Sequence, residues 1–243
     1  MVTVADGRFV LSNAAGGRLA DASLVGTILV VQATPELVLE LRVDGVRNDA
    51  AAVGSALTVY EVAVREDDGT WRRACPANAK GLAEAVPLRG YWDTQGDHHD
   101  IDGTFTLACT ATALGKCVRM GYRPWQTAPD GRSFRKLHQA CTRMLRADYC
   151  GDGRSWTKDG TIINVFDGYG IQVQDPRSDL AFEAAWAADG AVCVAKPRLP
   201  QRHDVAMIEA ACPARLRHRT GAECTLARAS RAADVLFNES SAR

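Results

Sequence analysis

Residues 138–153 read His-Gln-Ala-Cys-Thr-Arg-Met-Leu-Arg-Ala-Asp-Tyr-Cys-Gly-Asp-Gly, and this stretch decides how we expect the chain to fold. Its first half belongs to a predicted amphipathic helix over residues 134–147, with Ser133 as the N-cap. Apolar side chains recur on one face of that helix, so Cys141 should lie on its buried side. Asp148 ends the helix, and Gly151 turns the chain.

The same stretch resembles the signature of a known protein family. The resemblance rests on Arg146-Ala147-Asp148-Tyr149-Cys150-Gly151-Asp152-Gly153, on Cys141-Thr142-Arg143-Met144 and Asp159-Gly160-Thr161 beside it, and on Lys116-Cys117 and Gly121-Tyr122-Arg123-Pro124-Trp125 upstream. Together these residues resemble the bacterial ADYC domain family over most of residues 57–195. The family has no assigned activity, so the resemblance predicts the kind of molecule and not what it does.

Composition and charge argue against two large classes of protein. The chain has 243 residues, 47% of them hydrophobic, which is enough to bury one sizeable core or two small ones. Lys plus Arg and Asp plus Glu both number 29, and this balance disfavours nucleic acid as a partner, because phosphate binding needs a basic surface. The longest apolar runs, such as residues 24–31, have about eight residues against the roughly 20 that cross a bilayer, so no membrane span is expected.

The eight cysteines predict disulfides and a secreted or periplasmic location. They are Cys75, Cys109, Cys117, Cys141, Cys150, Cys193, Cys212 and Cys224. Zinc is the alternative, but only His138-x-x-Cys141 approaches the spacing of a zinc half site. The opening Met1-Val-Thr-Val-Ala-Asp-Gly is not a leader peptide, so either a leader has been removed or the export inference is wrong.

The connectivity of the cysteines stays open, although geometry constrains it. If residues 141–150 were helical throughout, the Cα atoms of Cys141 and Cys150 would lie about 13 Å apart, beyond the roughly 7 Å that a disulfide allows. We expect each to tie the helix region to a different strand, unless the chain doubles back at Asp148. Cys109 and Cys117 could meet across a hairpin or pair elsewhere.

Apolar and polar residues alternate near the N-terminus, which predicts a β-rich segment over residues 1–70. Leu37, Leu39, Leu41 and Val43 fall on one face of one strand. An ADYC-like, disulfide-stabilised domain is predicted over residues 71–225, and a tail that should fray over residues 226–243.

Within the second segment we predict a hairpin over residues 161–174 and short helices at 179–188 and 203–212. The fold class is therefore α+β, rich in antiparallel sheet and stapled by disulfides, with a central helix and two further short helices.

Four aspartates interleaved with glycines form an acidic loop region: Asp148, Asp152, Asp159 and Asp167. Calcium takes carboxylate and carbonyl oxygens at flexible corners of this kind. The EF-hand spacing is absent, however, and Asp-Gly is also the commonest hairpin turn. We therefore expect no cofactor, with calcium at this loop as the alternative.

One nucleophilic set can be assembled, with Cys117 as the nucleophile, His138 as the base and Asp148 orienting the imidazole. No local motif supports it, and Cys117 has a free thiol only if a second cysteine is also unpaired. The candidate binding residues are Tyr149, Asp152, Arg146 and Trp125. For these the structural interpretation is that Arg146 or Arg143 neutralises Asp148 or Asp152, and that Tyr149 is buried against Trp125 or Trp156.

Two functions follow from these candidates. The first is an exported, disulfide-stabilised binding or surface-interaction protein, whose partner is a protein or a small molecule. The alternative is a secreted hydrolase or transferase with its site around the signature loop. A cleft lined by His138, Asp148, Tyr149 and Asp152 would favour the enzyme, whereas burial of these residues would make the signature architecture.

Overall fold

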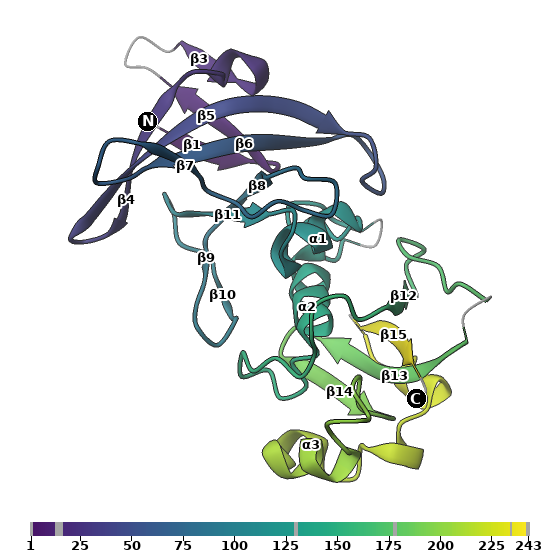
Figure 1. Ribbon diagram of the computed structural model, residues 1–243. Coiled ribbons are helices and arrows are strands. Elements are labelled where there is room, and N and C mark those ends of the chain that lie inside the picture. The colour runs from purple at the N-terminus through teal and green to yellow at the C-terminus, as the bar shows by residue number, and fades with distance from the viewer. Residues whose placement is uncertain (1, 13–16, 129–130, 177–178, 234, 242–243) are drawn as a thin grey trace. The chain divides into compact units, whose positions relative to one another are not determined.

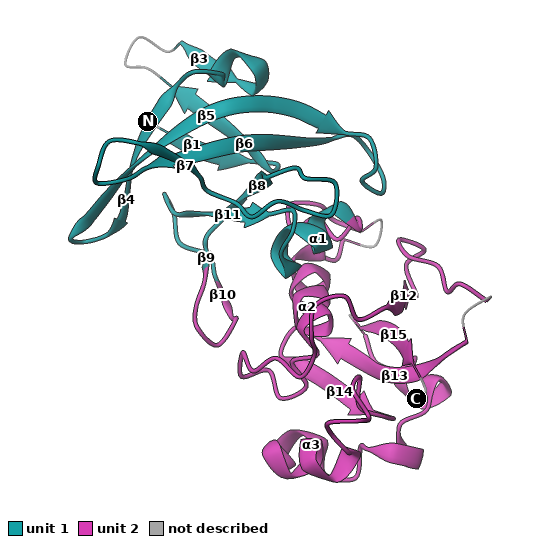
Figure 2. Ribbon diagram, viewed as in Figure 1, with its two compact units in different colours: residues 1–91, 99–119 teal, residues 92–98, 120–243 magenta. Residues whose placement is uncertain are grey.

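The computed structural model describes residues 2–12, 17–128, 131–176, 179–233 and 235–241 (Figure 1). The chain forms two compact units, residues 1–91 with 99–119 and residues 92–98 with 120–243 (Figure 2). These units divide the chain at other positions than the three predicted segments. The architecture is α+β with antiparallel sheets and disulfides, as the sequence predicts.

The first unit contains two antiparallel sheets, which confirms the β-rich character predicted for residues 1–70. The smaller sheet comprises β1 (Val2–Ala5), β2 (Arg8–Ser12) and β3 (Arg18–Ala20). The larger sheet has the order β11-β8-β6-β5-β4, with β7 also on β6. Its strands are β4 (Ile28–Thr34), β5 (Leu37–Asp49), β6 (Leu57–Arg65), β7 (Trp71–Arg73), β8 (Glu84–Arg89) and β11 (Phe105–Cys109).

Phe9 of β2 is the centre of the core that joins these two sheets. Its ring lies 5.2 Å from the rings of both Tyr60 and Phe105, and its backbone N–H donates to the Tyr60 hydroxyl at 3.2 Å. Leu41 and Val43 are buried in the same core, as their alternation predicts. The unit also contains the 3-10 turn η1 (Asp21–Leu24) and the helix α1 (Ala113–Arg119).

The second unit is built on a four-stranded antiparallel sheet with the order β12-β15-β13-β14. The strands are β12 (Ile163–Asp167), β13 (Leu180–Ala187), β14 (Gly190–Val194) and β15 (Leu236–Ser241). The central helix α2 (Phe134–Arg146) contacts β13, β14 and β15. Short elements complete the unit: α3 (Val205–Ala211), α4 (Pro213–Leu216), η2 (Gly221–Glu223) and α5 (Leu226–Ala229). A two-stranded ribbon, β9 (Tyr91–Trp92) with β10 (His98–His99), has its tip in this unit.

Helix α2 matches its prediction closely. The hydroxyl of Ser133 accepts a hydrogen bond from the backbone of Arg135, as an N-cap should, and Leu137, Cys141 and Met144 are buried. Ala147 ends the helix in the left-handed conformation, with φ 50°. The predicted helix over residues 203–212 is also present, as α3.

Three predicted elements are wrong. Residues 179–188 form the strand β13 instead of a helix, because they are buried between β14 and β15 and this tertiary context outweighs the helix propensity of Ala and Glu. The 161–174 hairpin is absent among the described residues, since β12 pairs with β15. The prediction of a fraying tail is wrong for its described residues: 236–241 form an inner strand of the sheet and are mostly buried.

The disulfide prediction is confirmed, because all eight cysteines are disulfide-bonded. Cys75 pairs with Cys109 in the first unit. In the second unit Cys150 pairs with Cys212 at the end of α3, and Cys193 of β14 pairs with Cys224. Cys117 lies within helix α1 and not after a hairpin turn, and it does not pair with Cys109.

Candidate functional site

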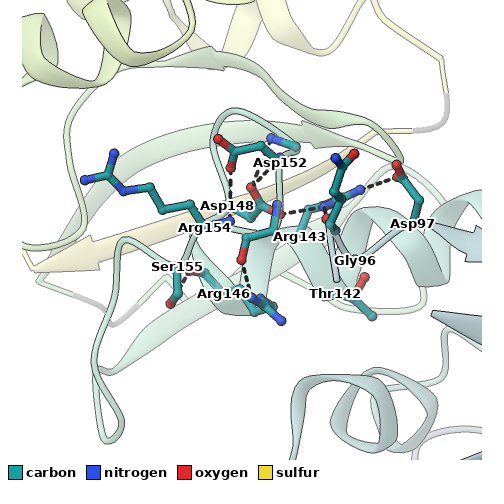
Figure 3. Close-up of polar contacts among 12 residues, drawn as sticks. Gly96, Asp97, Thr142, Arg143, Arg146, Asp148, Asp152, Arg154 and Ser155 are labelled. Carbon is teal, nitrogen blue, oxygen red and sulfur yellow. Dashed lines mark hydrogen bonds and ion pairs between the residues drawn. The ribbon is translucent and has the colours of Figure 1, made fainter. Parts of the chain in front are cut away.

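The signature loop is organised around the carboxylate of Asp148, which lies at the end of α2 (Figure 3). Its Oδ1 accepts the backbone N–H groups of Gly151 and Asp152 at 3.0 and 3.1 Å. Its Oδ2 accepts the N–H of Gly153 at 3.0 Å and the guanidinium of Arg143 at 2.6 Å. Both oxygens are therefore occupied by internal donors, and the side chain is completely buried.

Arg143 connects the Asp148 carboxylate to the tip of the β9–β10 ribbon in the second unit. The guanidinium donates to the carbonyl of Gln95 at 2.5 Å and to that of Ala188 at 3.3 Å, and it forms an ion pair with Asp97. A buried arginine that binds two carboxylates and two carbonyls holds three chain segments in register. The sequence predicted that Arg146 or Arg143 neutralises Asp148 or Asp152, and in the structure Arg143 pairs with Asp148.

Two glycines of the loop are required by close packing as well as by their conformation. Gly151 has φ 72°, and a Cβ added there would lie 1.9 Å from the carbonyl oxygen of Asp189. At Gly153, with φ 83°, the added Cβ would lie 2.6 Å from the carbonyl oxygen of Thr94. No side chain fits at either position, so the loop is closed against its surroundings.

Tyr149 points into a second buried network. Its ring stacks on Trp186 at 5.2 Å, and it lies 6.3 Å from Trp156. Its hydroxyl donates to Glu183 at 3.0 Å and accepts the backbone N–H of Arg198 at 2.8 Å. Burial of Tyr149 with a backbone and a carboxylate partner is thereby confirmed, with Trp156 rather than Trp125 in ring contact.

Glu183 is the acceptor at the centre of this network. It is fully buried and faces the guanidinium of Arg198 at 2.9 to 3.1 Å, and the Asn238 amide donates to it at 2.8 Å. Burial is the largest single influence on the pKa of Glu183 and would raise it. Attraction to Arg198 together with the hydrogen bonds from Arg198, Ser240 and Asn238 outweighs burial, so the pKa lies below its ordinary value. Burial beside this carboxylate raises the pKa of Tyr149 well above 10, so the phenol stays protonated.

A serine next to a lysine recurs as a nucleophile and base in some hydrolases, and one such pair lies beside Glu183. The Nζ of Lys196 donates to Ser240 Oγ at 2.7 Å, and burial lowers the pKa of Lys196. Ser240 is completely buried, however, so its hydroxyl is not exposed to a substrate. We interpret the pair as part of the internal network.

The predicted nucleophilic set lacks a free thiol, because its cysteine is disulfide-bonded. Cys117 is completely buried and disulfide-bonded. His138 is also buried, 1% exposed, with its ring 5.6 Å from that of Trp92. Asp148 is engaged by Arg143, as described above.

The remaining sequence candidates are exposed or half-buried side chains. Arg146 is exposed and donates to the carbonyl of Gly153, and Asp152 is exposed and accepts the N–H of Arg154 at 3.0 Å. Trp125 is half-buried in the turn after α1. No group of three metal-binding side chains gathers within the described part of the chain.

A second aspartate loop, at the end of β12, uses the same device as the signature. Asp167 accepts the backbone N–H groups of Tyr169, Ile171 and Gln172 at 2.7, 3.2 and 2.9 Å. The Tyr122 hydroxyl donates to it at 2.8 Å. Burial raises the pKa of Tyr122, and the neighbouring carboxylate raises it further. Gly168 and Gly170 have open space where a Cβ would lie, so this loop faces outward.

This loop borders a groove of about 450 Å³ in the second unit. The groove has an apolar floor: the rings of Phe166 and Phe237 stack at 5.5 Å, and Val235 and Leu226 lie beside them. The polar rim comprises Arg132, Asp167, Tyr169, Gln174 and Ser230. Arg132 donates to the hydroxyl of Tyr169 at 3.0 Å, with its guanidinium 4.8 Å from the centre of that ring.

Sequence reasoning did not find this groove. Its floor combines the end of β12 with β15 and α5, which are distant in the sequence. The available signals were Asp167-Gly168 and Tyr169-Gly170, which mark a turn but not a binding surface.

The helices of the described residues are all too short or too polar to cross a membrane. Searches of the curated proteins and of the solved structures returned no match to this chain. The family model described as ADYC domain matches residues 21–200, which is most of the chain and includes the whole signature. The chain therefore belongs to the ADYC domain family.

Proposed function

We propose that this chain is an exported binding protein in which the ADYC signature is the internal support and the groove beside Asp167 holds the ligand. The observation that carries the proposal is the contrast in exposure between these two sites. Asp148 and Tyr149 are completely buried with every polar contact internal, whereas the groove is open and lined by both apolar and polar side chains.

The chemistry of the groove favours a small organic molecule. Its volume of about 450 Å³ falls within the usual range of roughly 300–1,000 Å³ for ligand pockets. The stacked rings of Phe166 and Phe237 suit a flat apolar group, and Tyr169 and Gln174 at the rim suit hydrogen-bonding substituents. A ligand with an apolar body and one polar end matches this lining.

The cysteines support export. All eight are disulfide-bonded, and reducing compartments keep thiols free. We expect thiol titration of the protein, unfolded without reductant, to detect no free thiols. Four or more free thiols would contradict both the bridges and the export.

Two serine variants test where the ligand binds. Ser230→Trp places an indole in the groove, and Ser155→Trp adds the same side chain beside the signature. Both serines are exposed and each donates to a backbone carbonyl, so the local cost of the two changes is similar. The probes are benzoate, benzamide and phenylacetate. Their binding is monitored by NMR through the chemical shifts of the backbone amides.

We expect the probes to shift the amide signals of Tyr169 and Ser230 in the parent and in Ser155→Trp, but not in Ser230→Trp. Shifts centred on Gly151 to Gly153, or lost only in Ser155→Trp, would place binding at the signature and contradict the proposal.

A further inference from the structure

We propose that β4 of the first unit is a self-association edge, which pairs antiparallel with β4 of a second copy of the chain. This inference concerns a surface that the proposed function does not use. It rests on the open edge of β4, on an apolar groove beside that edge, and on the absence of charge in the strand.

Strand β4 is at the end of the six-stranded sheet and pairs with β5 alone among the described strands. Its sequence, Ile-Leu-Val-Val-Gln-Ala-Thr, contains no charged residue and no proline. Proteins usually protect such edges with lysine, proline or a covering element, because an open edge offers unpaired N–H and C=O groups to another strand. The one irregularity, a register shift between Gln32 and Thr34, is at the end of the strand and leaves Ile28–Val31 regular.

A groove of about 310 Å³ runs beside this edge. On one side it is lined by Val2, Leu11 and Leu19, which are direct cross-strand partners in the smaller sheet and so form one apolar row. Ile28 and Val30 of β4 line the other side. A strand added to β4 would therefore meet apolar side chains as well as backbone partners.

The side chains of this region are unusually exposed for their type. Val30 is 66% exposed and Ile28 is 50% exposed, and Leu19 across the groove is 45% exposed. These three side chains line one groove, and exposed apolar side chains that gather in this way mark an interaction site rather than scattered exposure.

Charge and sequence select a second copy as the occupant. The residues that line the groove are mostly apolar and none is charged, so the groove suits an extended, uncharged strand, and Ile28–Val31 is such a strand. Antiparallel pairing of two β4 strands brings no like charges into opposition. The nearby charges on β5 are already paired within the chain, Glu40 with Arg65 at 2.9 Å and Arg42 with Asp44 at 2.5 Å.

Sedimentation velocity over a range of protein concentrations tests the proposal. The test variant is Val30→Lys, which puts a charge on the edge without disturbing the core, and the matched control is Val173→Lys, at a valine that is 78% exposed in the second unit. We expect concentration-dependent dimers for the parent and for Val173→Lys, and an association constant at least tenfold lower for Val30→Lys. Equal melting temperatures for the two variants would show that both are folded.

A parent protein that stays monomeric at all concentrations would overturn the proposal, as would dimers that Val30→Lys leaves intact. A synthetic peptide of residues 27–35 tests whether the edge accepts an added strand. If it binds to a parent that is itself monomeric, the edge accepts a strand without forming a dimer, and the second copy is wrong.

Discussion

The second unit contains two loops that are built in the same way and are used differently. In each, one aspartate accepts hydrogen bonds from three backbone N–H groups of the following turn and a further one from a side-chain donor. For Asp148 that donor is the buried guanidinium of Arg143, and for Asp167 it is the hydroxyl of Tyr122. The local sequences, with aspartate followed by glycines, are correspondingly alike.

The difference lies in what surrounds the two turns. Around Asp148 the glycines touch the backbone of Asp189 and Thr94, so the loop is part of the interior. Around Asp167 the glycines face open space, and the loop borders a groove. A motif of this kind thus specifies a turn, and its burial decides whether that turn is support or surface.

The largest expected difference between the loops is at their glycines. We expect Gly151→Ala to cost about 4 kcal/mol or more, because its Cβ would overlap the Asp189 carbonyl and its φ is positive. Gly170→Ala, with a similar φ of 74° but open space, should cost only about 1–2 kcal/mol. Urea unfolding of the two variants measures both, and equal losses would remove the distinction between the loops.

The aspartates should differ next. Asp148→Asn removes the buried carboxylate that faces the Arg143 guanidinium and leaves only the half-exposed Asp97 as its ion-pair partner. Losing one partner of a buried pair costs about 3 kcal/mol or more. Asp167→Asn replaces a carboxylate that accepts from a neutral tyrosine hydroxyl, so we expect about 1 kcal/mol. The free energies of unfolding decide this, and a larger loss for Asp167→Asn would reverse our assignment of support and surface.

Substitutions of Tyr149 and Tyr169 compare the signature with the groove through smaller changes in the free energy of unfolding. Tyr149→Phe should cost about 1–2 kcal/mol, because Glu183 and the Arg198 N–H each lose a buried partner. Tyr149→Ala should cost about 3–5 kcal/mol for the lost ring contacts. Tyr169→Phe, at the groove, should change stability by no more than about 0.5 kcal/mol. Thermal unfolding compares the three, and a Tyr149→Ala protein as stable as the parent would contradict a structural signature.

The signature network should also be sensitive to acid. The pKa of Glu183 is lowered in the folded chain, so at acidic pH the unfolded chain binds more protons and stability rises with pH. The stabilisation is present above the ordinary pKa of a glutamate and is lost as the pH falls through the lowered value. Glu183→Gln should flatten this dependence, whereas Glu36→Gln, at an exposed glutamate, should not. Identical pH profiles for the two variants would exclude Glu183 as the cause.

Local patterns predicted the signature well because its contacts are close in the sequence. Ser133 caps α2, and Asp148 accepts from residues three to five positions later, so turn and helix chemistry suffice. Strand β15 was missed because both of its faces are buried. Asn238 and Ser240 form hydrogen bonds with internal partners, whereas polar residues in a sequence suggest contact with solvent. The groove was missed since Phe166 and Phe237 meet only through the pairing of β12 with β15.

Native-state hydrogen exchange tests the central claim most directly, because it compares the same backbone donors in both loops. We predict that the amides of Gly151 and Gly153 exchange only through global unfolding, with the same denaturant dependence as the core strands. The amides of Tyr169 and Gln172 should exchange through local opening, at a lower free energy that denaturant hardly changes. Signature amides that exchange by local opening, as readily as those of the Asp167 loop, would contradict the assignment of the signature to the interior.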